Sequence, residues 1–64
     1  MMIQAKFSKP VFAQVEPLLF KKFGAFVAQG QLDNDTWLLL AYVYKSDVPL
    51  AEKLLSEQKD FISF

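Results

Sequence analysis

Residues 36–44 read TWLLLAYVY and carry no charged side chain. In a strand, one face would hold Trp37, Leu39, Ala41 and Val43, and the other would hold Leu38, Leu40, Tyr42 and Tyr44. Because both faces are apolar, the period alone does not separate a strand from a buried helix, and leucine is a good helix former. The length of the run, the turn residues on both sides and the Tyr-Val-Tyr ending favour a strand. A buried helix over the same residues is the alternative, and it would make the chain an all-α three-helix bundle.

The N-terminal residues 2–7 show the two-residue alternation of a half-buried strand. Ile3, Ala5 and Phe7 share one face, while Gln4 and Lys6 share the other. The chain is therefore predicted to begin with a strand whose outer face is polar.

An apolar stripe between Ser8 and Gly30 recurs every three or four residues. Its members are Phe12, Val15, Leu19, Phe23, Phe26 and Val27, and the pattern predicts an amphipathic helix over about residues 9–29. Ser8 is placed to cap the start of this helix and Gly30 to end it. Pro17 lies on the polar side, where it either kinks the helix or divides it in two.

The C-terminal third predicts a second helix after the turn formed by Lys45-Ser46-Asp47. Asp47 is a candidate N-cap, and Pro49 falls in the first turn, where proline is tolerated. The apolar face would hold Leu50, Leu54 and Phe61, flanked by Ala51, Leu55 and Ile62. Residues 61–64 can instead leave this helix as a short terminal strand.

Together these elements predict a β-α-β-α order in one α+β domain over residues 1–64, with a minimal sheet packed on two amphipathic helices. Strands joined through a helix usually pair in parallel. A two-stranded sheet is unstable alone, and the second strand would expose Leu38, Leu40, Tyr42 and Tyr44. We therefore expect a homodimer or another protein to cover that face or to extend the sheet edge.

The composition indicates a contact surface rather than a reaction centre. The 64 residues include no histidine, cysteine or arginine, and seven lysines balance seven acidic residues. Histidine and cysteine carry much of proton-transfer, nucleophilic and metal chemistry, and arginine dominates phosphate and base recognition. We expect no enzyme activity, cofactor, metal site, small-molecule substrate or nucleic-acid partner. The lack of cysteine is compatible with a reducing compartment, and we expect a cytoplasmic protein.

The acidic cluster Asp33-Asn34-Asp35 is interpreted as a turn rather than a cation site. A calcium loop of the EF-hand type beginning at Asp33 would need glycine at its sixth position and glutamate at its twelfth. The chain has Leu38 and Tyr44 at those positions.

The function that these features predict is binding to another protein. Hydrophobic residues make up 53% of the chain, and large amphipathic aromatic side chains anchor interfaces. Our hypothesis is a small inhibitor, adaptor or accessory subunit whose protein-binding residues are Leu38, Leu40, Tyr42 and Tyr44.

The alternative function is a membrane-surface amphipathic effector peptide acting through residues 9–29, where Lys21 and Lys22 adjoin two phenylalanines. The net charge of zero gives no attraction to anionic lipid, so membrane binding is not expected. No apolar run approaches the roughly 20 residues that a membrane-spanning helix needs.

Overall fold

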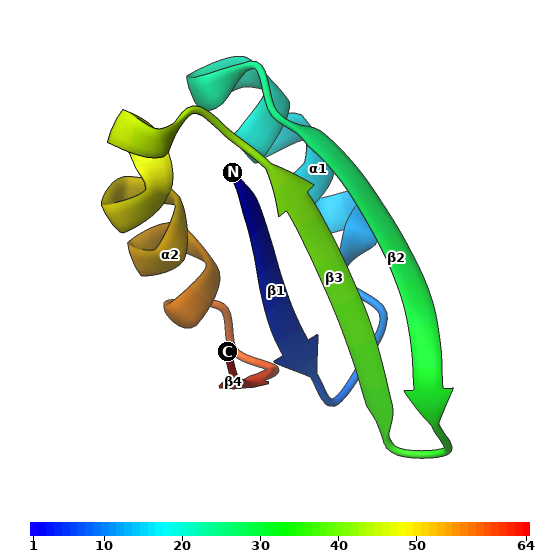
Figure 1. Cartoon of the computed structure of the whole chain (residues 1–64). Coiled ribbons are helices and arrows are strands. Elements are labelled where there is room, and N and C mark those ends of the chain that lie inside the picture. Colours follow the sequence, from blue (N-terminus) through cyan, green and yellow to red (C-terminus); the bar gives the residue numbers. More distant parts are fainter.

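The computed structural model describes all residues, 1–64, and shows a four-stranded antiparallel sheet with two helices packed on one face (Figure 1). The strands lie in the order β2-β3-β1-β4, which is a split β-α-β arrangement because β3 lies between β1 and β2. The predicted α+β class is confirmed, and the all-α bundle is wrong. In chain order the elements are β1 (Met2–Phe7), α1 (Phe12–Phe23), β2 (Phe26–Asp33), β3 (Thr36–Tyr42), the 3₁₀ turn η1 (Lys45–Asp47), α2 (Val48–Ser56) and β4 (Phe61–Ser63).

Strand β1 forms where the alternation predicted it. Its burial alternates along the strand, with Ile3, Ala5 and Phe7 buried. It pairs with β3 in the antiparallel sense, so that Phe7 lies opposite Trp37. The predicted parallel pairing of these two strands is wrong. The chain forms an unpredicted strand, β2, which runs parallel to β1, and it then turns back into β3, which is antiparallel to both.

Helix α1 is shorter than predicted, because Gly24 ends it and Gly30 does not. Gly24 adopts a left-handed conformation with φ 64°. Its N–H donates to the Phe20 carbonyl at 2.8 Å, and the N–H of the next residue, Ala25, donates to the Leu19 carbonyl at 3.4 Å. This is a common way for a glycine to close a helix. Pro17 lies inside the helix and does not divide it. Ser8 does not cap the helix either, since Val11 occupies the N-cap position without a side-chain bond.

Strands β2 and β3 form a hairpin around the predicted acidic turn. The Asp35 N–H donates to Asp33 Oδ1 at 2.9 Å, which stabilises the turn from within. The predicted strand over residues 36–44 is confirmed from Thr36 to Tyr42. Trp37 lies on the helix side, as expected, since it shares a face with the buried Leu39.

Helix α2 begins after η1, with Pro49 in its first turn as predicted. Asp47 stands at the N-cap position but makes no side-chain cap bond. Ala51 and Leu55 are buried, whereas Leu50 is exposed and does not belong to the core face. The helix ends at Ser56, so its predicted continuation to residue 61 is wrong.

The terminal residues form the short strand that the sequence left as an alternative. Phe61 lies opposite Phe7 in the pairing of β4 with β1. The two rings meet edge to face, with centroids 5.7 Å apart and an interplanar angle of 75°. The C-terminal strand is thereby tied to β1 and forms the edge of the sheet opposite β2 (Figure 1).

The core lies between the sheet and the helices and contains no polar side chain. With four strands the sheet is large enough to form within one chain, so the argument for a dimer from a two-stranded sheet does not hold. The opposite face of the sheet carries no helix. The twelve buried residues are Ile3, Ala5, Phe7, Val11, Val15, Leu19, Ala25, Leu39, Ala41, Val43, Ala51 and Leu55.

Candidate functional site

The candidate site is the face of the sheet turned away from the helices, which we call the open face. Residues that pair directly across an antiparallel ladder project to the same side of the sheet. The register of β1, β2 and β3 therefore defines the open face without ambiguity. Its residues are Met2, Gln4, Lys6, Phe26, Ala28, Gly30, Leu38, Leu40 and Tyr42.

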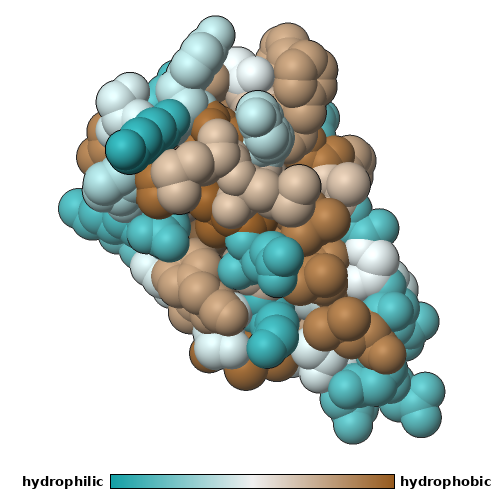
Figure 2. Space-filling model, viewed as in Figure 1, coloured by the Kyte–Doolittle hydropathy of each residue, from teal (hydrophilic) through white to brown (hydrophobic).

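The open face is bulkiest at the end where β2 begins, because the residues that β2 contributes change from Phe26 to the small Ala28 and Gly30 along the strand. At the bulky end Tyr42 lies between Met2 and Phe26, and the exposed fractions of these side chains are 59%, 54% and 75%. Toward the hairpin turn, Leu40 lies opposite Ala28 and Leu38 opposite Gly30. Figure 2, which views the sheet from this side, shows hydrophobic residues gathered above the hydrophilic hairpin turn.

Three of the four predicted binding residues lie on the open face. Leu38 and Leu40 are half-buried there between neighbouring strands, and Tyr42 is exposed. Tyr44 is not part of this face, because β3 ends at Tyr42 and the alternation does not continue into the loop. Their role in binding stays a prediction.

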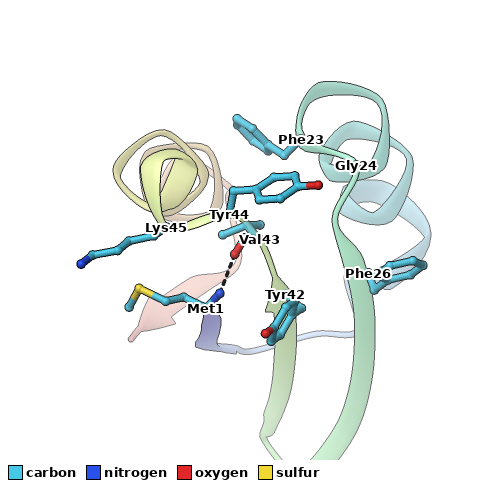
Figure 3. A pocket seen from close by; sticks show the side chains of 8 residues that line it. All are labelled: Met1, Phe23, Gly24, Phe26, Tyr42, Val43, Tyr44 and Lys45. Atoms are coloured by element: carbon cyan, nitrogen blue, oxygen red, sulfur yellow. Dashed lines mark hydrogen bonds between the residues drawn. The ribbon is translucent and has the colours of Figure 1, made fainter.

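Tyr44 contributes instead to a shallow hollow at the bulky end of the open face. Its ring extends from the loop toward the start of β2, while Tyr42 and Phe26 project from their own strands (Figure 3). The N-terminal amine of Met1 donates to the Val43 carbonyl at 2.6 Å and holds one side of the hollow. The hollow has a volume of about 350 Å³ and is lined by Met1, Phe23, Gly24, Phe26, Tyr42, Val43, Tyr44 and Lys45.

Phe26 and Met2 belong to the open face, and sequence reasoning missed both of them. Phe26 continues the three-residue spacing from Phe23, so the sequence pattern places it in the helix stripe. The available signal was Gly24, which is a natural helix end ahead of a possible strand. Met2 gives no such signal, because it shares its face of β1 with the polar residues Gln4 and Lys6.

The polar side chains of the open face and its hollow are two tyrosines, one glutamine and two lysines, and the N-terminal amine of Met1 also lies at the hollow. No group of three acidic side chains gathers to hold a metal ion, and neither helix is long and apolar enough to cross a membrane. No protein-family model, curated protein or solved structure matches this chain.

Proposed function

We propose that this protein is a non-enzymatic protein-binding module, a small inhibitor, adaptor or accessory subunit, that acts through the open face. One observation carries the proposal: a chain with a filled, wholly apolar core still exposes large apolar side chains on three adjacent strands. Contiguous exposed apolar surface of this kind marks interaction sites in soluble proteins. The proposal includes the expected cytoplasmic location and requires no cofactor.

The arrangement of the open face suits recognition of a protein surface. Tyr42 and Phe26 are large, have few torsions to freeze, and project from a hydrogen-bonded sheet rather than from a loop. Tyr42 adds a hydroxyl that can bond at the edge of a contact. Gln4 and Lys6 border the apolar residues on β1, as polar rim residues do in protein interfaces. Tyr42, Phe26 and Leu40 are the anchors that we expect to contribute most of the binding energy.

The test uses the chain as bait to capture proteins from cell extracts. Variants of the chain then distinguish specific binding from unspecific apolar contact. Tyr42→Asp and Leu40→Asp place a charge on the open face, and Leu50→Asp places one on α2. Leu50 is the matched control, because its exposed fraction of 59% equals that of Tyr42. A partner retained by the wild type and by Leu50→Asp, and lost by both open-face variants, supports the proposal.

Two outcomes contradict the proposal. One is a partner that is lost equally with Leu50→Asp, which would mean unspecific apolar contact. The other is a pair of open-face variants that unfold by circular dichroism, which would mean that this face is structural.

The membrane-surface alternative gains no support from a specific observation. Helix α1 covers residues 12–23 rather than 9–29, and Val15 and Leu19 from its apolar stripe are buried in the core. Binding lipid through that stripe would require the helix to leave the sheet. Circular dichroism with and without anionic vesicles tests it, since insertion would raise the helical signal.

A further inference from the structure

Strand β2 leaves one edge of the sheet unpaired along its whole length. It is the terminal strand in the order β2-β3-β1-β4, and Figure 1 shows no element beyond it on that side. Soluble proteins usually protect such edges with lysine, proline, shortness or a covering loop. Strand β2 has eight residues, and the stretch from Phe26 to Leu32 contains neither a charge nor a proline.

The other edge of the sheet is protected by its length and its irregularity. Strand β4 has three residues, and its register with β1 shifts between Lys6 and Phe7. A strand added there would find few backbone groups in line. Edge pairing is therefore favoured at β2 and disfavoured at β4.

Opposite charges stand at the two ends of β2. Lys21 and Lys22 occupy the last turn of α1, immediately before the strand begins. Asp33 and Asp35 lie at the far end, in the hairpin turn. An antiparallel neighbour with the same charges would set its acidic end beside these lysines, whereas a parallel one would oppose like charges.

We propose that the occupant of this edge is a second copy of the same chain, paired antiparallel through β2 about a two-fold axis. A strand is complementary to itself in this orientation, both in backbone hydrogen bonding and in the charges at its ends. The two four-stranded sheets become one continuous sheet. When open-face residues of one β2 lie opposite open-face residues of the other, the two open faces lie on the same side of the joined sheet and form one surface. The proposal is independent of what the open face binds.

The two-fold axis makes a sharp geometric prediction. Antiparallel strands advance in opposite directions by about 3.3 Å per residue, so equivalent positions in the two copies separate quickly away from the axis. A disulfide requires Cα atoms within roughly 4.4–6.8 Å. One residue away from the axis, equivalent Cα atoms are already about 8 Å apart, because an offset of about 6.6 Å along the strands adds to about 4.8 Å between them. Only the residue on the axis can therefore form a disulfide between copies. Because matching faces require a residue to lie opposite its own equivalent, the axis passes through one residue, and the two central residues of β2 are Gln29 and Gly30.

The experiment is a single-cysteine scan in a chain that has no cysteine of its own. Cysteine replaces each β2 residue from 26 to 33 in turn, and controls are placed at Tyr42 on the open face and at Ile62 on β4. At Gly30 an added Cβ meets nothing within 4 Å, so that variant is compatible with the fold. Under mild oxidation we expect disulfide-linked dimer to peak between positions 28 and 31 and to fall to the background at both ends of the strand.

A charge exchange tests the orientation. Lys22→Glu and Asp35→Lys should each raise the dissociation constant of the dimer several-fold at low ionic strength, as measured by light scattering over a hundredfold concentration range. The double variant should recover part of this loss, because positions 22 and 35 again carry opposite charges while Lys21 and Asp33 keep theirs.

Three results overturn the inference. A cross-linking peak at Tyr42 would place the dimer on the open face, and a peak at Ile62 would place it on β4. A chain that stays monomeric over the whole concentration range, with no peak in β2, removes the pairing altogether. Because Tyr42→Asp does not alter the β2 edge, loss of partner binding in that variant with unchanged β2 cross-linking separates this inference from the proposed function.

Discussion

Gln29 of β2 caps the N-terminus of α1, where its side-chain oxygen Oε1 accepts the backbone N–H of Val11 at an N–O distance of 2.8 Å. The same oxygen accepts the N–H of Phe12 at 2.9 Å. The first N–H groups of a helix have no partner within the helix and need one from outside. A residue 18 positions later in the chain provides it, so the helix start and the edge strand stabilise each other.

The first prediction is that Gln29→Ala destabilises the protein by about 1–2 kcal/mol, because two N–H groups lose their acceptor. Gln29→Glu should keep most of that stability, since a carboxylate accepts hydrogen bonds and interacts favourably with a helix N-terminus. The matched control is Gln31→Ala on the same strand, which is exposed and should change stability by less than about 0.5 kcal/mol. Urea unfolding measures all three. Equal stability of the two alanine variants would show that the cap contributes nothing.

The second prediction concerns the two glycines, for which the same substitution should have opposite effects. Gly24→Ala should cost about 1 kcal/mol, because alanine is strained at φ 64° although nothing lies within 4 Å of its new Cβ. Gly30→Ala should be neutral or stabilising by about 0.5 kcal/mol, because the strand backbone suits alanine and the site is open. Thermal melts of the two variants at equal concentration test this. A loss of stability in both would mean that an unseen contact surrounds Gly30.

The third prediction compares Phe7 and Phe26, which are the same residue type and differ in burial. Phe7 is wholly buried beside Phe61, whereas Phe26 is 75% exposed on the open face. Phe7→Ala should cost about 3–5 kcal/mol, which is enough to unfold a domain of this size. Phe26→Ala should leave the unfolding midpoint of the monomer within a few degrees of the wild type. Comparable destabilisation by the two variants would contradict the assignment of the open face as solvent-exposed.

The strands predicted correctly are those whose signal is local. Ile3, Ala5 and Phe7 alternate with polar residues, and the turn residues on both sides of 36–44, together with its Tyr-Val-Tyr ending, favour a strand over a buried helix. Residues 26–33 could not be assigned in the same way, because Phe26 and Val27 continue the helical spacing of Leu19 and Phe23. The helix ends only because Gly24 adopts a left-handed conformation, and the following residues gain more from pairing with β3 than from extending α1.

The candidate site was predictable only in part, for a related reason. Alternation alone places Leu38, Leu40 and Tyr42 on one face, and the polar face of β1 indicates that this side is open. Phe26 joins them only through its pairing with Tyr42, which depends on recognising β2. The alternation also places Tyr44 on this face, because nothing in the sequence pattern shows that the strand ends at Tyr42.

The last prediction tests whether the open face is accessible in the folded protein before any partner is known. A dye that fluoresces on exposed apolar surface should bind the folded wild type, with its binding centred on the bulky end of the open face and the hollow beside it. Phe26→Ser combined with Tyr42→Ser should remove most of this fluorescence, because both side chains line that hollow.

The matched control for the dye experiment is Phe20→Ser combined with Leu50→Ser, which removes two exposed apolar residues from the helices instead. This pair should leave the dye signal close to that of the wild type. If both double variants lower the signal equally, the apolar surface is diffuse and the open face is not distinct. If neither binds less dye and both remain folded, Phe26 and Tyr42 do not form the accessible patch that the register of β2 and β3 places between them.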